Sequence, residues 1–161
     1  MDEILEILEK DARTTPEEIA RMLGRNPADV KRAIRQFEKK GIILGYKAII
    51  NDELHKQAGS SVKALIEVSV SPEKDLGFDK VAERIYRYPE VKSCYLLSGA
   101  YDLLVVVEGP DLHTVTTFVH EKLAPLKNVN KTVTHFFLKT YKEDNVIMKG
   151  REDDKRIAIS Y

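Results

Sequence analysis

The first forty residues carry apolar side chains at helical spacing, in three groups separated by short polar segments. The first group begins directly after Met1. The second opens with Thr15-Pro16-Glu17-Glu18, in which Thr15 can cap a helix, Pro16 suits its first turn, and Glu18 can return a bond to the Thr15 amide. Asn26-Pro27 repeats this cap-and-proline pattern, and Gly24 lies between the two helices. Two short helices joined by a glycine-containing turn are typical of a helix-turn-helix unit.

The later part of the chain changes to a period-two pattern, which is typical of strands. Apolar and other residues alternate over 62–70, and the segments 92–97, 103–108 and 129–141 also favour strands. Helical spacing returns at 78–85 and at 112–119. The order strand, helix, strand, strand, helix, strand predicts a ferredoxin-like βαββαβ domain, with four antiparallel strands and both helices on one face.

These patterns predict an α+β protein built from a winged-type helix-turn-helix domain and a ferredoxin-like domain. Residues 42–50 are β-prone apart from Gly45, and the polar segment 51–61 suggests a hinge. We therefore expect a helix-turn-helix domain at 1–45, a linker strand and hinge at 46–61, a βαββαβ domain at 62–142, and a tail at 143–161.

The strands of the second domain are apolar on both faces. In 103–107, leucine or valine occupies every position, and in 133–138 the two faces carry Val133, His135 and Phe137 against Thr134, Phe136 and Leu138. Helices on one side of a sheet leave its other face to solvent, where polar residues are expected. We therefore predict a homodimer that packs sheet against sheet; the alternative is a tail, 143–161, that folds back over this face.

Charge becomes informative only when its position is considered. The chain holds 26 basic and 26 acidic residues, but residues 21–47 contain eight basic residues against two acidic ones. The third helix would turn Lys31, Arg32 and Arg35 outward, where they can donate to guanine in the major groove. Lys39 and Lys40 are better placed for phosphates, and the helix start at Asn26 offers free amides. The alternative is a solvated charged face without a partner.

Other chemistry has little support in the sequence. Cys94 is the only cysteine, so neither a disulfide within the chain nor a cysteine-rich zinc site can form. His113 and His120 share a helical face, whereas zinc requires three or four converging ligands, so we predict no metal and no cofactor. No signal peptide, membrane span or catalytic motif is recognisable, and we expect a cytoplasmic protein that is not an enzyme.

The residues that carry these patterns resemble the leucine-responsive/asparagine-responsive (Lrp/AsnC) family of transcription regulators over about residues 3–142. The matching stretches are EILEILEKDARTTPEEIARMLG, VKRAIRQFEKKGIILGYKAIIN, LSGAYDLLVVVEG and NVNKTVTHFFLK. The most specific feature is the G-x-Y-D loop at 99–102. The resemblance implies a sequence-specific regulator of double-stranded DNA with a near-palindromic operator, and dimers that assemble into larger rings such as octamers.

The resemblance also implies an amino acid or related small effector bound between neighbouring effector domains. By position, Gly99, Tyr101 and Asp102 would line that site, with Thr132 and Thr134 as weaker candidates. Glycine admits a ligand close to the backbone, and an aspartate can meet an ammonium group. The alternative is that Gly99 only forms a turn and Asp102 only caps the hairpin.

Two further functions share this architecture. Some haem-pathway decarboxylases resemble it and act on a tetrapyrrole, but they would be expected to cluster histidine, tyrosine and arginine on the sheet with tryptophan nearby. This chain has no tryptophan, and its corresponding stretch reads SGAYDLL. The other function is that of a partner-binding variant, in which the helix-turn-helix contacts protein instead of DNA.

Overall fold

The computed structural model describes residues 2–51, 61–72 and 77–148. The chain divides into two compact units, Met1–Ile49 and Ile50–Tyr161, and each is described here by itself. The hinge expected at 51–61 and the tail expected at 143–161 lie largely outside the described residues. Within the described residues, no helix is both long enough and apolar enough to cross a membrane.

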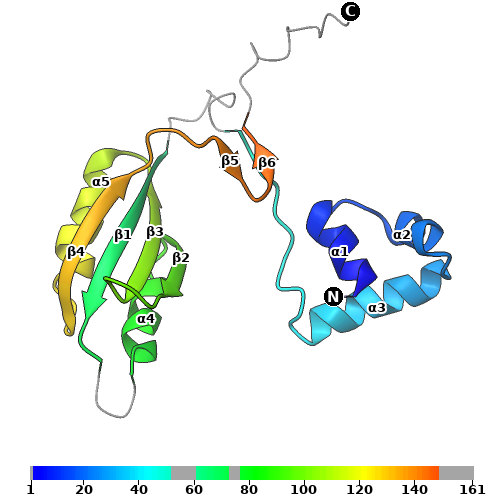
Figure 1. The fold of residues 1–161 in the computed structure, drawn as a ribbon, viewed down its shortest axis with the longest axis horizontal. Helices are drawn as coiled ribbons and strands as arrows, with labels where there is room; N and C mark the ends of the chain where they lie inside the picture. The colour runs from blue at the N-terminus through cyan, green and yellow to red at the C-terminus, as the bar shows by residue number, and fades with distance from the viewer. Residues whose placement is uncertain (1, 52–60, 73–76, 149–161) are drawn as a thin grey trace, which may run out of the picture. The chain divides into compact units, whose positions relative to one another are not determined.

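The N-terminal unit consists of three helices, α1 (Glu3–Lys10), α2 (Pro16–Leu23) and α3 (Pro27–Lys39), shown in blue to cyan in Figure 1. Their apolar stripes meet in a small core, in which Ile4, Ile19 and Val30 are almost completely buried. The predicted capping box at Thr15 and Glu18 is present, and α2 ends at Gly24 in the left-handed conformation (φ 63°). This glycine turns the chain from α2 into α3.

The β-prone segment 42–50 forms no strand within the described residues, so the linker strand expected there is absent from this part of the structure. Ile43 packs against the helical core, but the side chains of Ile42, Leu44 and Ile50 are 53%, 91% and 59% exposed. β-propensity reflects packing against neighbouring strands, and none of the described strand pairings includes this segment.

The C-terminal unit has the predicted ferredoxin-like fold. Its elements are β1 (Val62–Val70), α4 (Asp79–Tyr86), β2 (Val91–Leu96), β3 (Leu103–Gly109), α5 (Leu112–Thr117), the π-helix η1 (Phe118–Leu123), β4 (Val129–Phe136), β5 (Lys142–Glu143) and β6 (Val146–Ile147). The strand order β2-β3-β1-β4 is antiparallel throughout, and the helices cover one face of the sheet (Figure 1).

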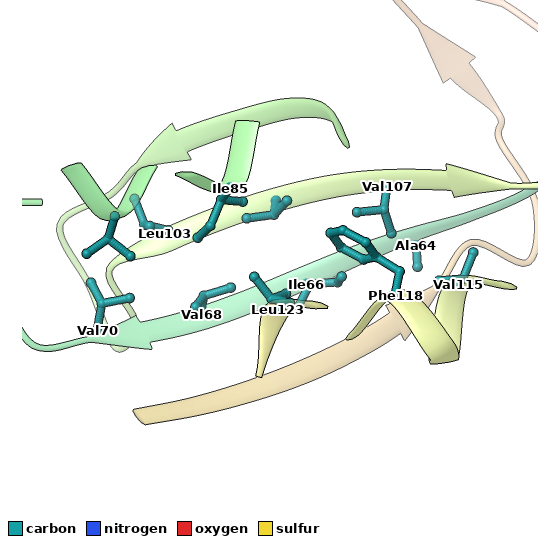
Figure 2. Close-up of a cluster of buried hydrophobic side chains, with 12 residues drawn as sticks. Ala64, Ile66, Val68, Val70, Ile85, Leu103, Val107, Val115, Phe118 and Leu123 are labelled. Carbon is teal, nitrogen blue, oxygen red and sulfur yellow. The ribbon is translucent and has the colours of Figure 1, made fainter. Parts of the chain in front are cut away.

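The core of this unit lies between the sheet and the helices. Alternate residues of β1 (Ala64, Ile66, Val68, Val70) and of β3 (Leu103, Val105, Val107) point toward Ile85 on α4 and toward Phe118 and Leu123 on η1, as Figure 2 shows for the labelled members of this group. Each of these residues is at most 5% exposed. The period-two pattern of the sequence therefore marks the core face directly.

The outer face of the sheet is the one turned away from the helices. It carries Leu65 on β1, Leu104 and Val106 on β3, and Val133 on β4, all only partly buried in the single chain. Glu67 and His135 lie beside them, and Glu67 Oε1 and His135 Nε2 are 3.1 Å apart, within hydrogen-bonding distance. We call the four apolar residues the outer apolar face.

The last strand is shorter than predicted. β4 ends at Phe136 rather than at residue 141, because its pairing partner β1 begins at Val62 and Phe136 already pairs with Ala64. After one more bond, from the amide of Phe137 to the carbonyl of Lys63, the chain leaves the sheet. Leu138, expected to share a sheet face with Thr134, is instead 97% exposed beyond the strand.

Candidate DNA interface and effector site

The helix α3 carries a basic face on the side opposite its buried residues. Because Val30, Ala33, Ile34 and Phe37 point into the core, the helical repeat places Arg32, Arg35 and Lys39 on the reverse side, with Lys31 at its edge. All four basic side chains are exposed. Arg32 also contacts Asp29 at 3.1 Å, but both side chains are more than 60% exposed, so this pair holds the guanidinium only weakly.

Asn26 and Lys40 mark the two ends of the same helix. The Asn26 side-chain oxygen accepts a hydrogen bond from the Ala28 amide at 2.8 Å, which makes Asn26 the N-cap of α3. Its side-chain carbonyl is therefore committed to the helix, while its exposed position leaves the amide nitrogen at the surface. Lys40 is the C-cap residue, and its amide donates to the carbonyl of Gln36.

The segment after α3 is tied back to the helix through Tyr46. Its hydroxyl donates to Glu38 at 3.1 Å. Partial desolvation of the phenol raises the pKa of Tyr46, and the bond to the Glu38 carboxylate adds to the shift. This tyrosine therefore remains a neutral donor at physiological pH and helps fix where the chain leaves α3.

The loop between β2 and β3 holds Gly99, Tyr101 and Asp102. Asp102 closes it: the amide of Leu97 donates to the Asp102 carbonyl at 2.8 Å, and the Asp102 amide donates to the carbonyl of Val68 on β1. One carboxylate oxygen of Asp102 then accepts from the Val70 amide at 2.8 Å. The side chain thus extends the β1–β3 ladder by one bond, and a structural role for Asp102 is present whether or not it meets a ligand.

Thr132 and Thr134 lie elsewhere in the same unit. They project from β4 toward the helix side of the sheet, since they pair with Val68 and Ile66 of the core face. There they line an open groove of about 500 Å³ between β4 and the α5–η1 helix. The other lining residues are His113, Thr116, Thr117, Val119, His120, Glu121 and Ala124. We call this the edge groove.

The structure therefore separates the predicted effector residues into two sets. Asp102 is bonded to β1 from the β3 side, and Thr132 pairs with β1 from the opposite side, so the two lie about two strand spacings, or roughly 10 Å, apart. The sequence places His113 and His120 on one helical face, but by itself it suggests for them only the role of metal ligands. The polar spacing 113, 116, 117, 120 was the signal that this face lines a groove.

Among the described residues, no group of three or more histidine, cysteine, aspartate or glutamate side chains is arranged to hold a metal ion. Cys94 is partly buried at the sheet, and burial raises the pKa of its thiol. Neither feature adds chemistry to the two candidate sites.

Comparison with known proteins assigns both units. Residues 63–147 match the family model of the Lrp/AsnC ligand binding domain, and residues 3–43 match a winged helix-turn-helix DNA-binding domain. The chain belongs to the Lrp/AsnC family. Its fold is that of the Lrp/AsnC regulators, and it is accordingly a DNA-binding transcriptional regulator with the ligand-binding domain of that family.

Individual Lrp/AsnC relatives agree with this assignment over nearly the whole chain. The HTH-type transcriptional regulator YugG of Bacillus subtilis is 46% identical over 158 residues, which is 98% of this chain and 95% of the relative. The leucine-responsive regulatory protein of Escherichia coli K12 is 27% identical, covering 92% and 89%. A solved structure, that of the Neisseria meningitidis transcriptional regulator NMB0573 in complex with L-Met, superposes with a TM-score of 0.69 at 29% identity, covering 88% of this chain and 89% of that one.

Proposed function

We propose that this regulator binds a near-palindromic operator as a homodimer and that α3 enters the major groove. The observation that carries the proposal is the basic face of α3. It points outward because the opposite side of α3 packs into the helical core, and an N-cap fixes the start of both α2 and α3. Lys31, Arg32 and Arg35 read or grip the bases, while Lys39, Lys40 and the helix start at Asn26 contact phosphates.

Dimerisation is supported by the outer apolar face. Leu65, Leu104, Val106 and Val133 form an apolar surface on the sheet that the described residues cover only in part. A second copy packed against this face would remove it from water and present two α3 helices to the two half-sites. We propose that such dimers assemble further, in the manner of the octameric rings expected for the family. Light scattering tests the first step: a monomer at micromolar concentration would contradict it.

We further propose that an amino acid or a related small metabolite modulates DNA binding. The matched ligand-binding domain and the relative in complex with L-Met support this. The candidate contacts are Gly99, Tyr101 and Asp102 in the β2–β3 loop and Thr132 and Thr134 in the edge groove. Because these sets are separated within one chain, a ligand that meets both would have to bridge neighbouring copies. In this proposal the protein has no enzymatic activity and acts in the cytoplasm.

A selection of bound fragments from genomic or random DNA tests the proposal directly. The selection is run at low and at physiological salt, because phosphate contacts alone weaken steeply as salt rises. A near-palindromic consensus that survives physiological salt is the expected result. Binding without enrichment, lost as salt rises, would contradict sequence-specific regulation, and loss of all DNA binding even at low salt would point to a partner-binding role for the helix-turn-helix.

A further inference from the structure

Most residues that line the edge groove carry a polar group, although apolar atoms make up the larger part of its exposed surface. Seven of the nine lining residues end in an imidazole, a hydroxyl or a carboxylate, and only Val119 and Ala124 are purely apolar. Its volume of about 500 Å³ lies within the usual range for small-molecule sites, roughly 300–1,000 Å³. The space therefore suits a small ligand, and the chemistry of its walls indicates which one.

The β4 side of the edge groove offers two hydroxyl groups as hydrogen-bond donors to a ligand. Within the described part of the chain, the hydroxyls of Thr132 and Thr134 make no hydrogen bond to protein atoms, and both side chains are partly buried against the helices. On the helix wall, Thr116 is different, because its hydroxyl already donates to the backbone carbonyls of α5. On the strand side, two hydroxyls are thus available to donate hydrogen bonds to an acceptor group of the ligand.

The helix wall offers the two imidazoles. His113 on α5 and His120 on η1 lie seven residues apart on one face, and within the described residues neither imidazole ring makes a hydrogen bond. Neutral imidazole donates one N–H, and the protonated form donates two and carries a positive charge. The carboxylates nearest to them in the chain are Asp111, which interacts electrostatically with His113, and Glu121, which also lines the groove. β4 contributes only the two threonines to the lining.

We propose that the edge groove binds an acidic amino acid, with one carboxylate on the hydroxyls of Thr132 and Thr134 and the other on His113 and His120. Glu121 then receives the ammonium group. This arrangement gives each charged group of the ligand a partner of opposite charge or a donor pair. It rests on the proposed effector function and names the class of ligand.

The same lining disfavours a large aliphatic side chain. Leucine or methionine would bring apolar surface against imidazoles and a carboxylate, which would lose water contacts without gaining hydrogen bonds. Val119, Ala124 and the threonine methyl groups supply apolar surface that can cover a short methylene chain. The ligand preference expected here therefore differs from the L-Met of the Neisseria meningitidis structure and from the leucine response that the Escherichia coli relative is named for.

Calorimetric titration of the full chain at a single pH tests this, with L-glutamate, L-aspartate, glutarate, L-leucine and L-methionine. We expect the two acidic amino acids to bind in preference to leucine and methionine.

Three variants localise the effect. The double variant H113A/H120A removes both imidazole donors, so its L-glutamate affinity should fall by roughly threefold to tenfold. Glu121→Gln should weaken L-glutamate binding and strengthen glutarate binding, because glutarate has no ammonium group to pair with the carboxylate. Lys92→Ala, which removes an exposed positive charge on β2, is the matched control and should bind L-glutamate like the parent.

Preference for leucine or methionine, no binding of any acidic ligand, or an unchanged L-glutamate affinity in H113A/H120A would each overturn the inference. The proposed regulatory function is read separately, from the fragment selection. Specific DNA binding that responds to leucine would support the regulatory function and contradict the acidic ligand. L-Glutamate binding without specific DNA binding would support the acidic ligand and contradict the regulatory function.

Discussion

Replacing Asp102 by alanine tests whether this loop residue is structural as well as a candidate ligand contact. The Asp102 carboxylate accepts the Val70 amide at 2.8 Å, and Val70 is only 5% exposed at the end of β1. Alanine leaves that N–H without its acceptor in a poorly solvated place. A buried donor left unsatisfied costs about 1–3 kcal/mol, and the lost bond involved an ionised acceptor, so we expect a value in the upper half of this range.

Thermal and urea unfolding of the full chain measure this cost. For a domain of this size, 1 kcal/mol lowers Tm by roughly 4–8 °C, so the expected fall is easily resolved. Asp102→Asn is the matched variant, because its side-chain oxygen can still accept from Val70 while the charge is lost. It should retain most of the stability. An alanine variant that unfolds at the parent's urea concentration would refute the structural role.

The pair of variants also decides the ligand question. If Asp102 meets the ammonium of an effector, both substitutions should abolish the response of DNA binding to that effector. If the residue only closes the hairpin, the asparagine variant should respond like the parent. A loss confined to the alanine variant would therefore reflect a disturbed loop and not a lost contact.

Three further outcomes are expected. Arg35→Ala should weaken binding to the selected operator by about 1–3 kcal/mol in a gel-shift titration and relax base preference at one position, while Lys40→Ala should weaken all sequences alike and reduce the salt slope by about one; equal losses on specific and random DNA would make Arg35 a phosphate contact. Hydrogen bonds from the Thr15 amide and hydroxyl lower the pKa of Glu18, so this carboxylate stabilises the folded state above its unfolded pKa and ceases to do so as pH falls through the lower folded value. The difference in Tm between the parent and Glu18→Gln should therefore narrow from pH 7 to pH 3, and a constant difference would contradict the capping role. Gly109→Ala should destabilise the C-terminal unit by about 1–3 kcal/mol in urea unfolding, because its new Cβ would lie 3.2 Å from Val115 Cγ2 and 3.3 Å from Thr114 Cγ2; unchanged stability would show that α5 shifts freely.

Local signals in the sequence were sufficient for most of the fold. The Thr15 capping box and the Asn26 cap involve residues two or three positions apart, so a short stretch of chain specifies them completely. The alternation over β1 and β3 marks the core face in the same way. Segment 42–50 failed as a strand because a strand is completed by a neighbour, which composition does not supply.

The candidate site was less predictable for the same reason. Which side chains share the edge groove depends on the pairing of β4 with β1 and on the seating of α5–η1 against the sheet, both of which are long-range contacts. Thr132 and Thr134 could be named from the resemblance, but their neighbours His113 and His120 could not be linked to them without the strand register. By contrast, the basic residues on the outward face of α3 could all be predicted from helical periodicity alone.

The π-helix η1 allows Phe118 and Leu123, which are five residues apart, to share one core. In an α-helix, residues five apart point about 140° away from each other, yet both of these side chains are buried in the same core (Figure 2). The wider turn, seen in the bond from the Ala124 amide to the Val119 carbonyl, reconciles them. Deleting one residue between them would leave them four apart, about 40° from each other in a regular α-helix, whereas inserting one would turn them about 120° apart. This stretch should therefore tolerate the loss of one residue better than the gain of one.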